Sequence, residues 1–307
     1  MVKVGIIGLS EGNGHPFSFS AILNGYEPEF FSNAGWPGIL NYLNKRDKSE
    51  IATLDARVTH VWTQDRDISN RLAAACFIEN IVDEYVDMIG EIDALIIARD
   101  DYAEHCRMAI PFLKKGIPVF IDKPLTLSLE ELAVFKPYIE SGLLMSCSGF
   151  RFCQELDSWR QNISQFGSIK LVQASVINGW NKYGIHMVDA VLSLGFSAPL
   201  YVEPVIYESH ESLNLVMADG SLCQINALGG EVVVFSLSTF GTKSCETVQI
   251  RDNFTAFRRT LFRFIEQVRT GTPAINPGET LLSIQTLIAG RKALDTGKRV
   301  YLKDLGI

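Results

Sequence analysis

The chain has 307 residues, of which 47% are hydrophobic and 21% charged, a composition typical of a globular protein. At roughly 150 residues per domain, the length predicts two domains. The net charge of −7 is opposite in sign to the basic surface that nucleic-acid binding requires, so we expect no nucleic-acid partner. No apolar stretch reaches the ~18 residues of a membrane span, and residues 4–9 are too short an apolar run for a signal peptide.

The six cysteines include no C-x-x-C pair. Their spacing therefore predicts no metal site, and we expect reduced, mostly buried thiols. Reduced cysteines and the lack of a targeting segment favour a cytoplasmic location.

The first 124 residues alternate strand-like and helix-like segments. Such alternation predicts βαβ units and a parallel sheet, and the nearly all-apolar strands indicate burial on both faces. Residues 26–56 insert an aromatic segment, which we expect to pack against this domain. The predicted strands are residues 2–9, 57–62, 94–98 and 118–121, and the predicted helices are residues 18–23, 69–77 and 103–115.

Residues 125–307 have a different pattern, in which a run of strands is flanked by helices. This predicts an α+β domain with a largely antiparallel, open sheet. Asp219-Gly220 is a hairpin signal, and Ser128 with Glu131 is a capping-box pattern. The predicted strands are residues 170–177, 201–207, 212–217, 222–227 and 232–237, and the predicted helices are residues 128–140, 186–194, 256–270 and 279–296.

A glycine-rich turn, residues 8–14 (GLSEGNG), follows the first strand. Small residues there let the main chain approach a pyrophosphate at the start of the next helix, where Pro16 suits the first turn. Ser10 replaces the second glycine of the usual G-x-G-x-x-G. Beyond the second strand, Thr63 and Asp65 leave the choice between NAD and NADP open, because an acid favours the free ribose whereas Thr63 with Arg66 tolerates a 2′-phosphate.

Lys123 ends the last strand of the first domain and precedes Pro124. In an open α/β sheet, ligands bind at the carboxyl ends of the strands. A partly desolvated lysine at that edge is suited to proton transfer. The alternative is an exposed lysine at a domain hinge.

With these features the chain resembles the Gfo/Idh/MocA family of NAD(P)-dependent oxidoreductases over essentially its whole length. The E-K-P motif of that family is Asp122-Lys123-Pro124 here. Residues 96–115 resemble the strand and helix before the motif, residues 149–152 (GFRF) the entry into the second domain, and residues 297–300 (GKRV) the closing segment. The family's D-x-x-x-H motif keeps its histidine as His186, but Lys182 stands in place of the aspartate.

The resemblance implies an N-terminal Rossmann domain and hydride transfer between NAD or NADP and a hydroxyl carbon of a sugar, cyclitol or related polyol. Two alternatives remain: an NAD-dependent glycoside hydrolase, or a dinucleotide-binding sensor or corepressor without turnover. Relatives associate through the open sheet, so a homodimer or homotetramer is expected.

The resemblance also implies residue roles. Lys123 would move the hydroxyl proton, with His186 and Tyr183 assisting. Lys182 would either bind an anionic group of an acidic sugar or face solvent. The implied cofactor-binding residues are Gly8, Ser10, Gly12, Asn13, Gly14, Thr63, Asp65, Ala98, Arg99, Asp122 and Lys123, and the implied substrate-binding residues are Arg151, Lys182 and His186.

Overall fold

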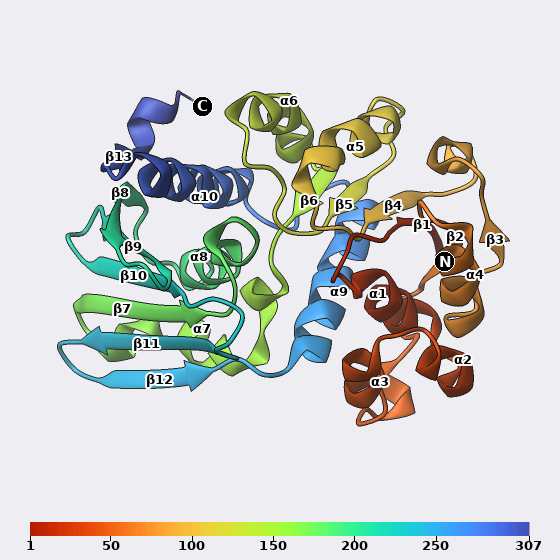
Figure 1. Cartoon of the computed structure of the whole chain (residues 1–307), viewed down its shortest axis with the longest axis horizontal. Coiled ribbons are helices and arrows are strands. Elements are labelled where there is room, and N and C mark those ends of the chain that lie inside the picture. Colours follow the sequence, from red (N-terminus) through yellow and green to blue (C-terminus); the bar gives the residue numbers. More distant parts are fainter. Residues whose placement is uncertain (307) are drawn as a thin grey trace. The chain divides into compact units, whose positions relative to one another are not determined.

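The computed structural model describes residues 1–306, which form two compact units (Figure 1). The first comprises Met1–Lys123, Pro137–Ser146 and Phe257–Ile275, and the second comprises Pro124–Lys136, Cys147–Ala256 and the residues from Asn276 onward. The chain thus leaves the first unit next to the predicted boundary but returns to it twice. The first return adds a strand to the parallel sheet, and the second adds most of a helix.

The first unit contains a six-stranded parallel sheet in the order β3-β2-β1-β4-β5-β6. This order is that of a Rossmann fold, which confirms the predicted fold class. All residues of β4, β5 and β6 are buried, as expected for a sheet covered on both faces. The strands are β1 (Val2–Ile7), β2 (Ala56–Trp62), β3 (Asn80–Ile81), β4 (Ala94–Ile97), β5 (Val119–Ile121) and β6 (Leu144–Ser146).

The strand register aligns the carboxyl ends of the four central strands. Ile7 of β1 lies opposite Trp62 of β2 and Ile97 of β4, and Ile97 lies opposite Ile121 of β5. The turns that begin at residues 8, 63, 98 and 122 therefore leave the sheet at one edge. This edge includes the reversal of strand order between β1 and β4, where ligands bind in such sheets.

The helices of the first unit include two in the aromatic insertion. Phe31 is fully buried there, and its ring lies 5.7 Å from that of Phe17, whereas Phe30 is exposed. The insertion therefore packs against the domain, as predicted. The helices are α1 (His15–Asn24), α2 (Pro28–Ser32), α3 (Pro37–Leu43), α4 (Arg66–Ala75), α5 (His105–Leu113) and α9 (Asn253–Thr270), with 3-10 turns η1 (Lys48–Glu50), η2 (Tyr85–Met88) and η3 (Tyr102–Glu104).

The second unit contains a seven-stranded sheet in the order β12-β11-β7-β10-β9-β8-β13 (Figure 1). Only β7 and β10 pair in parallel, so the predicted largely antiparallel sheet is confirmed. The predicted hairpin at Asp219-Gly220 joins β9 to β10. The strands are β7 (Ile169–Val176), β8 (Pro199–Ile206), β9 (Glu211–Met217), β10 (Leu222–Ala227), β11 (Phe235–Gly241), β12 (Cys245–Gln249) and β13 (Val300–Tyr301).

The main helices of the second unit pack on one another and on the sheet. α10 contacts both β8 and α8, and Gly290 of α10 leaves the space that the Trp180 ring fills. The Trp180 indole N–H donates to the Leu287 carbonyl at 2.9 Å. The helices are α6 (Leu129–Glu140), α7 (Asp157–Gln161), α8 (Ile185–Leu192) and α10 (Pro277–Thr296), with short turns η4 (Gly149–Phe152), η5 (Gln154–Leu156), η6 (Ile163–Phe166), η7 (Trp180–Gly184, π-helical) and η8 (Leu302–Leu305).

Two local predictions are corrected. The strand predicted for residues 232–237 begins only at Phe235, and Val232 and Val233 are exposed in the preceding loop. The capping box at α6 is half formed: the Ser128 hydroxyl accepts from the Glu131 N–H, but the Glu131 carboxylate accepts from the Thr126 hydroxyl. Thr126 also accepts from the Ser128 N–H, which takes the second bond of the box.

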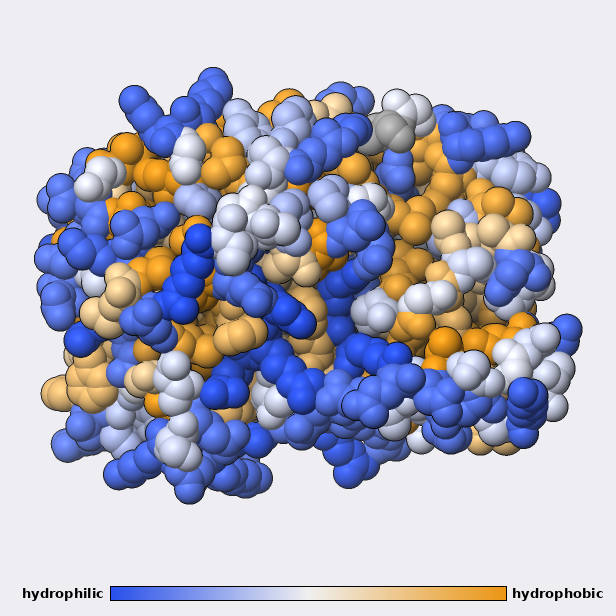
Figure 2. All heavy atoms as spheres, turned by 180° about the vertical axis from the view of Figure 1, so that it is seen from behind, coloured by the Kyte–Doolittle hydropathy of each residue, from blue (hydrophilic) through white to orange (hydrophobic). Residues whose placement is uncertain are grey.

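Hydrophilic and hydrophobic residues are interspersed over the face drawn in Figure 2. Within residues 1–306, none of the helices combines the length and the apolar character needed to cross a membrane. The same residues include no cluster of three or more His, Cys, Asp or Glu side chains that could hold a metal ion.

Candidate functional site

Lys123 lies two residues after the end of β5 and is only 4% exposed. The neighbouring Asp122 carboxylate is buried, and it accepts hydrogen bonds from His15 Nδ1 at 2.6 Å and Asn13 Nδ2 at 3.1 Å. Burial alone would raise the pKa of this carboxyl, but His15, Lys123 and Asn13 outweigh burial and lower it to about 2. The carboxylate is therefore ionised and fixed beside Lys123.

The turn between β1 and α1 provides a cradle for an anion. Within residues 1–306, the main-chain N–H groups of Glu11, Gly12 and Gly14 have no hydrogen-bond acceptor. Gly12 has a φ of +77°, and no atom lies within 4 Å of where its Cβ would be. Unpaired N–H groups at a helix N-terminus attract phosphate groups. This turn therefore fits the pyrophosphate of a dinucleotide.

Packing, rather than the approach of a cofactor, requires a glycine at position 14. A Cβ at Gly14 would lie 2.5 Å from the Trp36 ring and 2.6 Å from Ile39 Cδ1. The residue thus makes room for α3 of the insertion. Gly8 similarly makes room for Pro16, whose Cγ would lie 2.5 Å from an added Cβ.

Side chains that the sequence did not single out hold the cradle to the sheet. The Ser10 hydroxyl donates to Asp100 Oδ1 at 2.7 Å and accepts from the Asp100 N–H at 3.0 Å. Gln64 Nε2 donates to the Leu9 carbonyl at 2.6 Å, and the Leu9 N–H donates back to Gln64 Oε1 at 3.2 Å. Gln64 and Asp100 lie just after the ends of β2 and β4. The predicted strands were therefore the sequence signal that could have pointed to these two positions.

The other cofactor candidates at this edge have structural partners. The Thr63 hydroxyl donates to the Asp65 carbonyl at 2.6 Å, and Asp65 Oδ1 caps α4 by accepting from the Asp67 N–H at 2.8 Å. Arg99 donates to Gln64 Oε1 at 2.8 Å and to the Asp101 carboxylate. The choice between NAD and NADP therefore stays open, because these contacts favour neither a free 2′-hydroxyl nor a 2′-phosphate on the adenosine ribose.

In the second unit, His186 lies buried in α8 among aromatic rings. Its ring centroid lies 4.7 Å from that of Phe150, 5.3 Å from that of Tyr183 and 6.1 Å from that of Phe235. His186 Nδ1 and the Ser148 hydroxyl oxygen are 2.6 Å apart. Ser148, which the sequence did not single out, is 38 residues away along the chain.

Arg151 joins the buried polar groups behind His186. Its guanidinium lies 3.5 Å from Asp189 Oδ1 and pairs with the Glu279 carboxylate. Burial raises the pKa of Asp189, although Arg151 and hydrogen bonds from Ser148 and Ser283 oppose this rise. The contacts of Arg151 are thus those of a structural ion pair.

Lys182 is exposed on the π-helical turn η7. Among the residues predicted for this unit, the rings of Tyr183 and His186 are in contact. Arg151 reaches the same region through Asp189, which bonds to Ser148 beside His186. In the first unit, Asn13 of the glycine-rich turn bonds to Asp122, the residue before Lys123.

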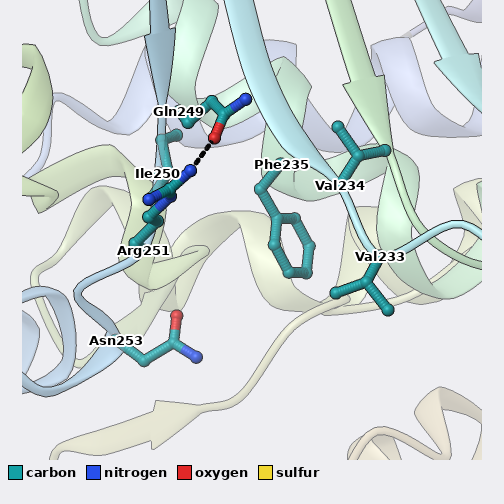
Figure 3. A pocket seen from close by; sticks show the side chains of 7 residues that line it. All are labelled: Val233, Val234, Phe235, Gln249, Ile250, Arg251 and Asn253. Atoms are coloured by element: carbon teal, nitrogen blue, oxygen red, sulfur yellow. Dashed lines mark hydrogen bonds between the residues drawn. The ribbon is translucent and has the colours of Figure 1, made fainter.

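A pocket of about 320 Å³ opens beside β11. Figure 3 shows the Phe235 ring between Val233 and Arg251, with a hydrogen bond from Arg251 to Gln249. Phe235 also contacts the His186 ring, so the pocket and the His186 cluster share one wall residue. The lining residues are Val233, Val234, Phe235, Gln249, Ile250, Arg251 and Asn253.

The family comparison agrees with the resemblance drawn from the sequence. Residues 34–141 match the GFO_IDH_MocA model, described as an oxidoreductase family with an NAD-binding Rossmann fold. The matched stretch includes Asp122-Lys123-Pro124. It does not include the glycine-rich turn at residues 8–14, which differs from the usual G-x-G-x-x-G. The resemblance is thereby confirmed for residues 34–141. No curated protein matches the sequence significantly.

Solved structures similar to this chain include three structures of two inositol dehydrogenases. Apo scyllo-inositol dehydrogenase from Lactobacillus casei has a TM-score of 0.77 at 14% identity, covering 99% of this chain and 98% of that one. Myo-inositol 2-dehydrogenase from Lactobacillus plantarum has 0.77 at 16% identity, covering 98% and 99%. The Lactobacillus casei scyllo-inositol dehydrogenase with bound NAD(H) and scyllo-inositol has 0.76 at 15% identity, covering 99% of each chain. At these identities the likeness establishes the fold.

Proposed function

We propose that this protein is an oxidoreductase of the Gfo/Idh/MocA family and transfers a hydride between NAD(P) and a hydroxyl-bearing carbon of a cyclitol, sugar or related polyol. The observation that carries the proposal is the buried Lys123, placed next to an ionised Asp122 at the ligand-binding edge of a Rossmann sheet. The inositol dehydrogenases of the same fold support a cyclitol as the first substrate to test.

The first unit would hold the cofactor. The N–H groups of Glu11, Gly12 and Gly14 would bind the pyrophosphate, and the turn at Thr63 and Asp65 would meet the adenosine ribose. When bound, the nicotinamide supplies the hydride chemistry.

Lys123 would take the proton from the substrate hydroxyl during oxidation and return it during reduction. Positioned acid–base groups of this kind contribute about 10² to 10⁴ in rate. Asp122 would keep the lysine side chain in place, because its carboxylate is itself fixed by His15 and Asn13. His186 and Tyr183 would orient or assist the reacting hydroxyl group.

The open face of the second sheet supports the proposed homodimer or homotetramer. The strand register places one apolar row across six strands, and its members are all partly exposed. A row of this kind is typical of a surface that a second copy covers. The row comprises Cys245, Phe240, Leu171, Leu222, Val216 and Tyr201. We also propose a cytoplasmic location, which the six free cysteines support.

The test is a panel of inositols, sugars and sugar acids, each with NAD⁺ or NADP⁺ and purified protein. We expect at least one cyclitol or polyol to reduce the nicotinamide, measured by its absorbance. If calorimetry detects no binding of either cofactor at millimolar concentration, the proposal is wrong. Release of a reducing sugar without net cofactor reduction would instead indicate a glycoside hydrolase.

A further inference from the structure

The Ser148 hydroxyl makes two contacts at the entry to the second unit. Ser148 is fully buried and begins the 3-10 turn η4, where its oxygen accepts from the Phe150 N–H at 3.1 Å. The same oxygen lies 2.6 Å from His186 Nδ1. One side chain thus caps a turn and engages a ring nitrogen.

Ser148 is itself held from behind by a buried carboxylate. Its main-chain N–H donates to Asp189 Oδ2 at 2.6 Å, and the Ser283 hydroxyl donates to Asp189 Oδ1 at 2.7 Å. Asp189 lies one helical turn after His186 on α8, and Ser283 lies on α10. The hydroxyl of Ser148 is therefore fixed relative to the helix that bears His186.

Aromatic packing limits the other movements of the His186 ring. The rings of Phe150 and Tyr183 lie within 5.3 Å of it, centroid to centroid. Packing restricts the position of an imidazole, but it does not distinguish its two nitrogens. A hydrogen bond at one nitrogen is what selects the tautomer of a histidine.

We propose that Ser148 is a positioning residue for His186. Its oxygen already accepts from the Phe150 N–H, so its hydrogen would be donated to Nδ1. This bond would fix the rotation of the imidazole and leave the ring proton on Nε2, which would donate to a bound hydroxyl group. Because the partner is a neutral hydroxyl, it orients the ring without the charge stabilisation that a carboxylate gives to imidazolium. The effect of this positioning on turnover rests on the proposed function, whereas the tautomer does not.

The experiment compares Ser148→Ala with Ser148→Thr, which keeps the hydroxyl, and with Ser283→Ala. The last variant removes a buried hydroxyl from the same network but leaves the His186 contact intact. Nitrogen-15 NMR of the His186 ring reports the tautomer in the full-length protein without a substrate. We expect one tautomer in the parent and in the threonine variant, and a mixture in Ser148→Ala.

Kinetics provide the second readout once a polyol substrate is found. Ser148→Ala should lower kcat by roughly tenfold or more, comparable to the about 10–100-fold seen when hydrogen-bond partners that orient metal-bound histidines are removed, with the KM for the cofactor unchanged. Ser148→Thr should restore most of the rate. An unchanged tautomer in Ser148→Ala, or equal effects in Ser283→Ala, would overturn the proposal. Absence of any turnover would defeat the proposed function alone, because the NMR result stands by itself.

Discussion

His15 Nδ1 donates a 2.6 Å hydrogen bond to the buried Asp122 carboxylate. His15 is the first residue of α1, and Asp122 directly precedes Lys123. The bond therefore ties the turn that fits a pyrophosphate to the strand end that bears the proposed acid–base residue. Asn13, within that turn, makes a second bond to the same carboxylate.

The pair gives a pH-dependent prediction. The pKa of Asp122 is lowered to about 2 in the fold, below the ~3.9 of an unfolded chain. A lowered carboxyl pKa stabilises the fold above about pH 4, and this contribution is lost as the pH falls towards 2. His15→Gln should therefore cost about 1–3 kcal/mol of unfolding free energy at pH 7, and the cost should shrink below pH 4.

Urea unfolding of both proteins across this pH range measures the difference. A double-mutant cycle with Asp122→Asn controls for changes in packing, because His15→Gln should cost little once the carboxylate is gone. A cost that is the same at pH 7 and at pH 3 would show that the hydrogen bond to the ionised Asp122 carboxylate is not its source.

Lys123→Met keeps much of the buried volume and removes the amine. We expect kcat to fall roughly a hundredfold or more, because proton transfer loses its positioned group, while the dinucleotide still binds. Lys115→Met is the matched control, since Lys115 is an exposed lysine of the same unit. Turnover by Lys123→Met at the parent rate would remove this lysine from the mechanism.

The sequence was sufficient for the sheet but not for the contacts at its edge. Apolar runs such as residues 94–98 predicted buried parallel strands, and Asp219-Gly220 predicted the right hairpin. The bonds of Gln64 to Leu9 and of Asp100 to Ser10 depend on which strands are neighbours and on their register. A single sequence specifies neither the neighbouring strands nor their register, so the strand pattern could mark the positions of Gln64 and Asp100 but not the bonds they make.

The same limit applies to Ser148 and to the edge strand β12. Ser148 meets His186 only because η4 and α8 pack together, and a lone serine predicts nothing by itself. β12 is mostly exposed on the sheet edge, so it lacks the apolar alternation by which strands are recognised. Gly14 was predicted to make room for a pyrophosphate, whereas the structure gives it Trp36 as a neighbour.

Gly14→Ala should therefore lower stability through the insertion. Its Cβ would collide with the Trp36 ring, and overpacking of this kind costs about 1–3 kcal/mol. Adding Trp36→Leu should recover part of the loss, measured as Tm. Gly12→Ala is the comparison, because its side chain meets open space and only the positive φ is strained, at about 1–2 kcal/mol. If Trp36→Leu gave no recovery, the collision would not be the cause.

Lys182 provides the last prediction, because it stands where the family motif has an aspartate. The sequence predicted that its ammonium binds an acidic substrate or faces solvent. The structure leaves Lys182 exposed, while Ser148 already engages His186 Nδ1. We therefore expect Lys182→Ala to keep kcat and KM for a neutral polyol within about twofold, as surface substitutions usually do. Lys182→Asp should not raise kcat, since the ring nitrogen that an acid would orient has its partner.

Tyr183→Phe is the contrasting variant, because the Tyr183 ring lies 5.3 Å from that of His186 and its hydroxyl is removed with little loss of volume. Steady-state kinetics with paired neutral and acidic substrates, such as an inositol and a sugar acid, measure all three variants. If Lys182→Ala raised the KM of the sugar acid tenfold and left that of the inositol unchanged, the ammonium would be an anion-binding group. The exposed position would then be the rim of the substrate site, and an acidic sugar the substrate. If Lys182→Ala left the KM of both substrates at the parent value, Lys182 would be a solvent-facing side chain. The hydroxyl of Ser148 would then be the group that orients His186.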